Sequence, residues 1–261
     1  MVWVRVLSAV GSVAPIQWST EAIMRVIFMS WLWLLGAGGC AATASSNRLS
    51  TDEVIARIDV AAQPEADSSK SHFTMVTASL LAAPDADSNV VLGDGDRLTA
   101  TLGTQTRAME PVAAGTYGTH FPWAEGEIVV SFERVDATGA PTSRGTLGPG
   151  FHLETRPLDT PVSRRAGVLE LSWAPVDPQA FVVVEIEGAC VQWVRKELGQ
   201  DVGSVQLTPE EMRPVELKEN QSCPVDVVIS RTRPGVPDPA LAHRSRVQVR
   251  QVRRTRFLSG P

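Results

Sequence analysis

The sequence predicts an all-β protein. Short segments in which apolar and polar residues alternate recur along most of its 261 residues, while helical periodicity is scarce. Glycine and proline are frequent and scattered between these segments, as turns require. The alternation is clearest in three segments, which are 97–102, 168–173 and 181–188. A strand that is buried on one face only has this pattern, so we expect sheets packed against each other.

Strand-like segments begin soon after residue 50. Residues 51–61 fit either a short helix capped by Thr51 or a strand from Val54, and the β-branched Ile55 and Ile58 favour the strand. Residues 63–71 are polar and contain Pro64, so we expect a loop there. Five further strands or strand pairs of the first half are expected at 72–81, at 90–92 with 97–102, at 116–121, at 127–135 and at 144–153.

A second series of strands follows a stretch that is rich in proline and arginine, residues 156–166. Its expected strands are 168–174, 181–190, 203–207, 224–231 and 246–258. Many short strands separated by turns are typical of immunoglobulin-like or fibronectin type III sandwiches. We therefore predict two such sandwich domains in tandem, at 51–156 and 164–261, with 156–166 as the linker.

The segment before these domains has the composition of an export signal. Met24 and Arg25 precede an apolar run at 26–35, which is too short to span a bilayer, and then Ala37-Gly38-Gly39 precede Cys40. The sequence resembles a bacterial lipobox, with Ala37 in place of the usual leucine. We expect residues 1–39 to be a leader, with 24–39 the lipoprotein signal and 1–23 a mis-called extension.

The resemblance to a lipobox implies cleavage before Cys40, a diacylglycerol on its sulfur and an acyl chain such as palmitate on its amine. Two or three acyl chains anchor a protein almost permanently. Residues 40–50 would then be a flexible lipidated tether, and Ala41, which is not aspartate, would favour the outer membrane. The alternative is an ordinary secretory signal cut near Ala42 or Ala44, which would give a soluble secreted protein.

Two further cysteines, Cys190 and Cys223, are expected to form a disulfide, which the oxidising cell envelope permits. Closing a loop of about 34 residues would stabilise the fold by roughly 3–4 kcal/mol. The alternative is a pair of buried free thiols.

An acidic cluster is a weak candidate for calcium binding. It consists of two Asp-x-Asp pairs in neighbouring turns, namely Asp85, Asp87, Asp94 and Asp96. Carboxylates are suitable ligands for Ca²⁺, but the spacing lacks the terminal glutamate of a calcium loop, and aspartate is an ordinary turn residue. The four histidines are too dispersed for a structural zinc site, so we predict no metal and no cofactor.

The last expected strand carries a run of arginines, from which Arg250, Arg253 and Arg254 are weak binding candidates for phosphate, lipid headgroups or an acidic polysaccharide. The alternative is a solvated strand face that pairs with glutamates and protects a sheet edge. Three tryptophans, Trp123, Trp173 and Trp193, could line a carbohydrate platform. Trp173 alternates with core residues and is expected to be buried, and Trp123, in a turn, is the weak candidate to test for exposure.

The second half of the chain resembles uncharacterised envelope lipoproteins of GC-rich Gram-negative bacteria that pair two immunoglobulin-like sandwiches. The resemblance rests on Leu-Glu-Leu-Ser-Trp-Ala-Pro (169–175), Glu-Gly-Ala-Cys (187–190), Cys-Pro-Val-Asp-Val (223–227), Arg-Thr-Arg-Pro-Gly (231–235) and Arg-Gln-Val-Arg (250–253). In the first half, Gly-Asp-Gly-Asp-Arg-Leu (93–98) and Gly-Thr-Tyr (115–117) fit the same arrangement. The resemblance implies fold and envelope localisation, and no activity.

The net charge of -5 argues against nucleic-acid binding, which needs a basic face. The sequence contains no nucleophile elbow, zinc-protease helix motif or phosphate loop, so we predict that the protein is not an enzyme. The preferred hypothesis is a cell-envelope lipoprotein, a non-catalytic binding or scaffolding module whose partner is an envelope protein or polysaccharide. The alternatives are a hydrolase or inhibitor acting on envelope polymers, and a structural spacer.

Overall fold

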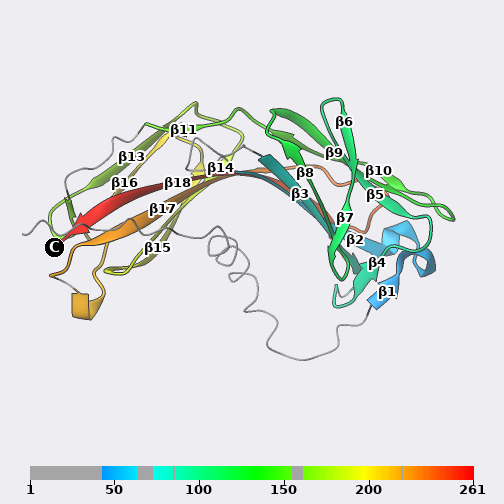
Figure 1. The fold of residues 1–261 in the computed structure, drawn as a ribbon, viewed down its shortest axis with the longest axis horizontal. Coiled ribbons are helices and arrows are strands. Elements are labelled where there is room, and N and C mark those ends of the chain that lie inside the picture. Colours follow the sequence, from blue (N-terminus) through cyan, green and yellow to red (C-terminus); the bar gives the residue numbers. More distant parts are fainter. Residues whose placement is uncertain (1–42, 64–72, 85, 155–160, 219) are drawn as a thin grey trace, which may run out of the picture. The chain divides into compact units, whose positions relative to one another are not determined.

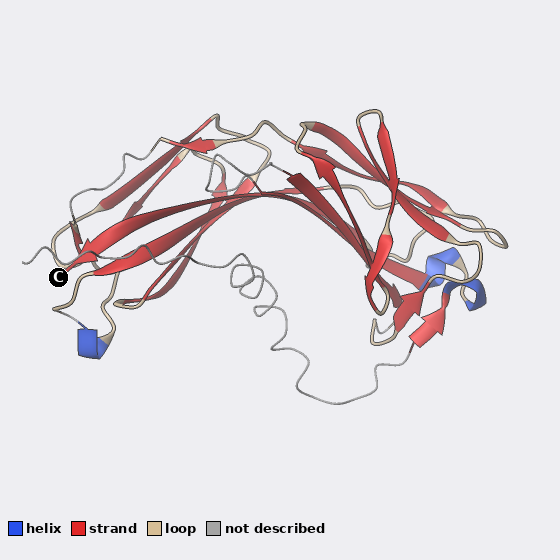
Figure 2. Cartoon of the chain, in the orientation of Figure 1, coloured by secondary structure: helices blue, strands red, loops and turns tan. Residues whose placement is uncertain are grey.

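The computed structural model describes residues 43–63, 73–84, 86–154, 161–218 and 220–261, and these form an all-β fold (Figures 1 and 2). The largest sheet has eleven strands, and its main path runs in the order β1-β4-β3-β2-β18-β17-β14-β15. The bounds of these strands are Thr43–Ser45 (β1), Asn89–Val91 (β4), Phe73–Ala82 (β3), Val54–Gln63 (β2), Arg246–Gly260 (β18), Cys223–Pro234 (β17), Phe181–Gly188 (β14) and Val191–Gln200 (β15).

Three more strands extend this sheet off its main path. Strand β8 (Thr116–Pro122) pairs with β3, β7 (Glu110–Ala113) pairs with β8, and β12 (Val162–Ser163) pairs with β18. Most neighbours are antiparallel, whereas β18 is parallel to β2, with Arg246 opposite Arg57 and Arg250 opposite Ala61. Figure 1 shows β18 beside β17 over its length and continuing to β2.

Two smaller sheets pack against this large sheet. One has four strands in the order β10-β9-β5-β6, which are Ala140–Leu147, Gly126–Glu133, Arg97–Leu102 and Gln105–Ala108. The other has three in the order β11-β13-β16, which are His152–Leu153, Leu169–Ala174 and Ser204–Leu207. The helical residues described are the single 3-10 turns Ser46–Arg48, Thr51–Glu53 and Glu216–Lys218.

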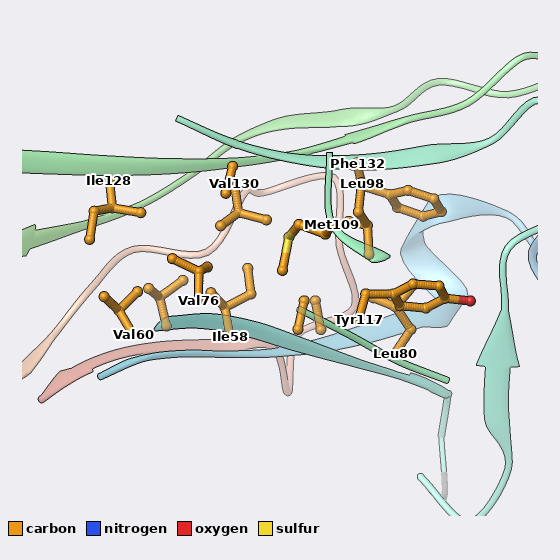
Figure 3. Close-up of a cluster of buried hydrophobic side chains, with 14 of the residues drawn as sticks. Ile58, Val60, Val76, Leu80, Leu98, Met109, Tyr117, Ile128, Val130 and Phe132 are labelled. Carbon is orange, nitrogen blue, oxygen red and sulfur yellow. The ribbon is translucent and has the colours of Figure 1, made fainter. Parts of the chain in front are cut away.

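Two clusters of buried side chains fill the space between the sheets. In the first, Ile58, Val76 and Leu80 of the large sheet face Val130 and other residues of the four-stranded sheet (Figure 3). The second contains Leu171 and Trp173 of β13 against Val184 of β14, Val227 of β17 and Phe257 of β18. Strand β18 serves both clusters, since Val247 and Val249 lie in the first.

The prediction of an all-β fold is confirmed, and most expected strands lie within two residues of an observed one. Strands β6, β7 and β15 were not expected, because their residues are mostly exposed and show no apolar alternation. The expected flexible tether at 40–50 is wrong from Thr43 onward, because 43–45 pair with β4 and Ser46 is fully buried. The leader 1–39, the polar segment 64–71 and most of the linker lie outside the described residues.

Of the expected linker, the described residues 161–166 pack against the second series of strands. Strand β12 pairs in parallel with Ser259 and Gly260 of β18, and Arg164 is buried. The tandem division at 51–156 and 164–261 stays a prediction. What the described residues add is that the C-terminal strand contributes to both cores.

Candidate functional site

The outer face of the large sheet, opposite the second core cluster, is the candidate site. Along β14 the side chains of Val182, Val184 and Ile186 enter the core, so those of Phe181, Val183 and Glu185 point to the other side. Strand β17 follows the same alternation, with Ser230 opposite Val183 and Thr232 opposite Phe181. The described residues of the smaller sheets pack only on the inner face, so this outer face is uncovered by them.

A groove of about 670 Å³ lies on this face. Its lining comes from β14, β15, β17 and β18, and it combines aromatic, aliphatic, hydroxyl and charged side chains. Phe181 contributes an aromatic ring that is 56% exposed, and Arg246 and Arg250 contribute guanidinium groups. The groove can therefore offer stacking, hydrogen bonds and positive charge to one ligand.

The arginines of this outer face fall into two groups. Arg256 donates to both carboxylate oxygens of Asp226, at 2.7 and 3.0 Å, and Arg195 pairs with Glu185 and Glu197 at 3.0 and 3.1 Å. Arg246, Arg250 and Arg254 of β18 are exposed, and Arg57 of β2 is half-buried on the same face. Within the described part of the chain these last four have no ion-pair or hydrogen-bond partner through their side chains.

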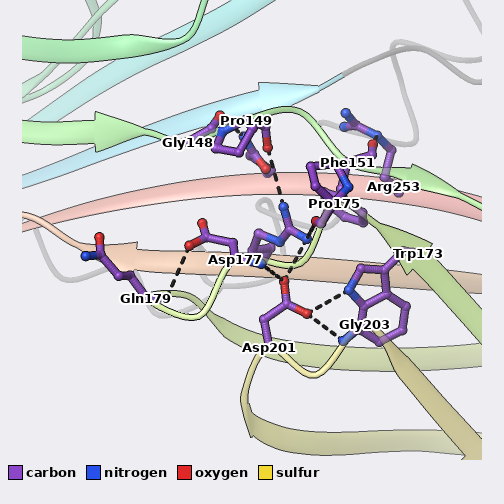
Figure 4. Close-up of polar contacts among 12 residues, drawn as sticks. Gly148, Pro149, Phe151, Trp173, Pro175, Asp177, Gln179, Asp201, Gly203 and Arg253 are labelled. Atoms are coloured by element: carbon purple, nitrogen blue, oxygen red, sulfur yellow. Dashed lines mark hydrogen bonds and ion pairs between the residues drawn. The ribbon is translucent and has the colours of Figure 1, made fainter.

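A buried polar network lies on the inner side, beneath β17 (Figure 4). Asp201 accepts hydrogen bonds from Trp173 Nε1 at 2.8 Å and from the Gly203 amide at 3.0 Å, and it pairs with Arg231 Nη2 at 2.6 Å. The side chains of Asp201 and Arg231 are 0% and 2% exposed. Arg231 also donates to the Pro175 carbonyl at 2.6 Å and stacks over Phe151. The network joins three turns to β17. Because its charged groups are buried and paired with each other, we interpret it as structural support.

A second ion pair extends this network. Arg233 holds Asp177 with two hydrogen bonds, of 2.6 and 2.5 Å, and Asp177 donates its amide to Asp201 at 2.9 Å. Burial raises the pKa of Asp177, but the hydrogen bonds and positive charge of Arg233 outweigh burial and leave this pKa below its usual value. Asp177 is therefore an ionised structural carboxylate. A cavity of about 10 Å³, the size of one water, adjoins it and Gln251.

The structure separates the arginines that the sequence grouped as binding candidates. Arg250 and Arg254 point outward, whereas Arg253 points inward, donates to the Phe151 carbonyl and stacks over the Phe151 ring at 4.7 Å. Burial lowers the pKa of Arg253 to about 10, and the nearby charge of Arg231 contributes. Trp123 is half-buried, packs against the first core cluster and covers Gly150, so it offers no open platform.

The aspartates considered for calcium differ in their surroundings. Asp85 is outside the described residues, and Asp87 and Asp94 are exposed. Asp96 accepts hydrogen bonds from Ser46 Oγ at 2.7 Å and from the Val135 amide at 3.0 Å, and its carboxylate lies 3.5 Å from Arg134 Nε. Asp96 thus fixes local structure. Among the residues that the structure describes, no three acidic, histidine or cysteine side chains cluster as metal ligands.

The expected disulfide is confirmed, because Cys190 and Cys223 are bonded and tie the turn after β14 to the start of β17. Arg164 lies against this bond, with Nη1 3.1 Å from Cys190 Sγ. Cys40 lies outside the described residues, so its lipidation stays a prediction.

Sequence reasoning missed the exposed aromatic side chain of Phe181, whereas Trp193, one of the three tryptophans considered for a carbohydrate platform, is 62% exposed. A signal for Phe181 was present. Glu185 and Glu187 indicate which face of that strand is exposed to solvent, and Phe181 alternates onto the same face. Trp193 shares parity with Arg195 and Glu197 on β15, a strand that was not predicted.

No protein-family model and no curated protein matches the sequence. A solved DUF3823 family protein from Parabacteroides merdae is similar over 76% of this chain and 98% of its own, with 12% identity and a TM-score of 0.22. A tetra-tandem repeat from the extending region of a large adhesion protein is similar over 78% of this chain, with 15% identity and a TM-score of 0.21. This chain spans half the length of that repeat structure.

These likenesses are too distant to carry an argument about function. The all-β class of this protein therefore rests on its own strands. Within the described ranges, no helix has both the length and the apolar character needed to cross a bilayer.

Proposed function

We propose that this protein is a cell-envelope lipoprotein, a non-catalytic module that binds another envelope component on the outer face of its large sheet. The observation that carries the proposal is the groove of about 670 Å³ on the sheet face opposite the two smaller sheets. Surfaces that combine an exposed aromatic ring with a few polar and charged groups are typical of binding sites.

The lipid anchor rests on the sequence, through the resemblance of residues 24–40 to a lipobox. Thr43 already belongs to β1, so only two residues, Ala41 and Ala42, separate Cys40 from the folded strands. The three residue steps from Cys40 to Thr43 reach at most about 11 Å, which would keep the folded part close to the lipid surface. A short reach favours partners at or near the membrane over distant ones.

The anchor is tested by mass spectrometry of the N-terminal peptide from isolated membranes. We expect an acylated peptide that begins at Cys40, and loss of the protein from the membrane fraction in Cys40→Ala. An unmodified terminus beyond Cys40 would contradict the lipoprotein assignment.

The binding face is tested by photo-crosslinking in cells. A photoreactive residue at Thr232 lies in the groove, and the same residue at the exposed Thr146 of β10 is a matched control on another sheet. We expect one discrete adduct from position 232 that position 146 does not give. Equal labelling from both positions would contradict a dedicated face.

A further inference from the structure

The arginines of β2 and β18 form one row on the outer face, which we call the arginine row: Arg57, Arg246, Arg250 and Arg254. Arg246 lies directly opposite Arg57 in the parallel pairing of the two strands. Arg250 and Arg254 follow at intervals of four residues, and such positions on a strand lie roughly 13 Å apart on the same face. The row therefore presents positive charge at a repeated spacing along a strand.

The arginine row lacks the counter-charges that other arginines of this face have. Arg256 is paired with Asp226 and Arg195 with two glutamates, whereas the described residues give no ion pair to any member of the row. Asp59 shares the face and is opposite Gln248, but it makes no ion pair with the row. Like charges directly opposite each other on neighbouring strands are destabilising. An anion that bound here would remove this repulsion.

The net charge of the whole chain is -5, so this positive row is a local segregation of charge. Guanidinium groups bind carboxylates with two parallel hydrogen bonds, which makes them selective for planar anions. Charge complementarity thus assigns an anionic partner to the row.

The groove beside the row indicates which kind of anion fits. Arg246 and Arg250 line the same groove as Phe181, Ser230, Thr232 and Gln248. A sugar ring can pack its C–H face on Phe181, while its hydroxyl groups bond to the serine, threonine and glutamine side chains. A flat lipid surface would contact the arginines but would not reach Phe181 and the hydroxyl and amide side chains inside the groove.

We propose that the groove and the arginine row bind a linear acidic polysaccharide, with its carboxylates on Arg246, Arg250 and Arg254 and a sugar ring against Phe181. This inference rests on the proposed use of the outer face for binding and adds the class of ligand.

The test is calorimetric titration of the full chain with polygalacturonate, with neutral dextran as the uncharged control and phosphatidylglycerol vesicles as the lipid control. We expect binding to polygalacturonate that weakens as salt is added, with none to dextran. The double variant R246Q/R250Q should weaken binding at least roughly tenfold, since it removes two charge-assisted contacts.

Matched variants make the result specific. R144Q/R213Q removes the same charge from exposed arginines outside the arginine row, and it should leave affinity within about twofold. F181A should weaken binding several-fold while the salt dependence stays, and R246K/R250K should recover part of the affinity. Circular dichroism checks that each variant is folded.

Equal losses in R246Q/R250Q and R144Q/R213Q would overturn the inference, as would binding to the vesicles without binding to polygalacturonate. That second result would assign the arginine row to a membrane surface. Failure of the lipoprotein assignment is distinguishable, because it appears in the N-terminal peptide and not in the titration.

Discussion

At the scale of single residues, Asp201 shows how polar groups organise this fold. Its carboxylate accepts hydrogen bonds from two backbone amides and from the Trp173 indole, and it pairs with Arg231, all out of contact with water. A buried pair of this kind adds little net stability over apolar packing, but removing one partner leaves an uncompensated charge. The identity of each partner is therefore strongly constrained.

We expect Asp201→Asn to destabilise the protein by about 3–5 kcal/mol, because it leaves the Arg231 charge buried without its partner. The measurement is urea unfolding at neutral pH. Asp226→Asn is the matched control, since it breaks an exposed pair with Arg256 and should cost less than about 1 kcal/mol. Similar losses in the two variants would show that burial does not govern the strength of these pairs.

Asp177 predicts a pH dependence. Its pKa in the folded protein lies below the usual value because Arg233 outweighs burial, so its contribution is fully present above about pH 4 and is lost as the pH falls through the folded pKa. The melting temperature of Asp177→Asn should lie below that of the wild type at pH 7. The gap should narrow in acid, where the wild-type carboxylate is protonated. A constant gap between pH 7 and pH 2.5 would contradict this assignment.

Residue-scale prediction from sequence succeeded where local pattern decides the outcome. Trp173 is buried as the alternation of its strand indicated, and Cys190 pairs with Cys223. The sequence could not show that Arg253 points inward while Arg250 and Arg254 point outward. The neighbours of Arg253 on the strand are Val252 and Arg254, one apolar and one charged, so alternation alone does not assign Arg253 to a face. Its contact with the Phe151 ring does.

At the scale of elements, Arg134 fixes the turns that follow β1, residues 46–51, to the end of β9. Its guanidinium donates to the carbonyl of Leu49 at 2.8 Å and to Thr51 Oγ1 at 3.0 Å, and it also binds the Ser46 carbonyl. Its side chain is almost fully buried beside Asp96. Arg134 is therefore one of the buried contacts that hold residues 46–51, beside the hydrogen bonds of Ser46 Oγ with Asp96 and the Gly93 amide.

Arg134→Met should release this segment, because it removes the buried donors to residues 46–51. The Gly93 amide, which donates to Ser46 Oγ, should exchange faster with deuterium. Arg97→Met is the control, since Arg97 forms an exposed pair with Glu133 and should leave that exchange unchanged. Unaltered exchange in R134M would show that the Ser46 turn is held without Arg134.

The disulfide is a second constraint at this scale, since it connects the ends of β14 and β17 across 33 positions of sequence. Replacing both cysteines with alanine should lower the free energy of unfolding by roughly 3–4 kcal/mol in the chain-entropy model. Urea unfolding of C190A/C223A against the wild type measures the loss. Reductant should shift the wild-type midpoint toward that of the variant, and a shift in the variant itself would point to another cause.

At the scale of the whole molecule, β18 connects the two cores. Its first half carries Val247 and Val249 into the first cluster, and its second half carries Phe257 into the other. A continuous strand that is buried at both ends transmits unfolding from one core to the other. The two cores are therefore expected to unfold together.

This expectation separates one cooperative unit from two tandem domains. Phe257→Ala should destabilise the second core by about 3–5 kcal/mol and lower protection of β2 and β3 in the first core by a similar amount in hydrogen exchange. Ile58→Ala in the first core is the reciprocal variant. Loss of protection confined to the mutated core would favour independent domains at 51–156 and 164–261.

The sequence by itself determined most of the strands, the inward and outward faces of those that alternate clearly, the disulfide and the resemblance of the leader to a lipobox. These features depend on local alternation with a period of two residues, on turn residues and on a few cysteines. The tertiary structure alone decided that β18 pairs with β2, which places Arg57 opposite Arg246 and aligns the arginine row. This pairing joins residues that are far apart in the sequence, and it depends on how both cores pack. No local sequence pattern therefore predicts which strand β18 pairs with.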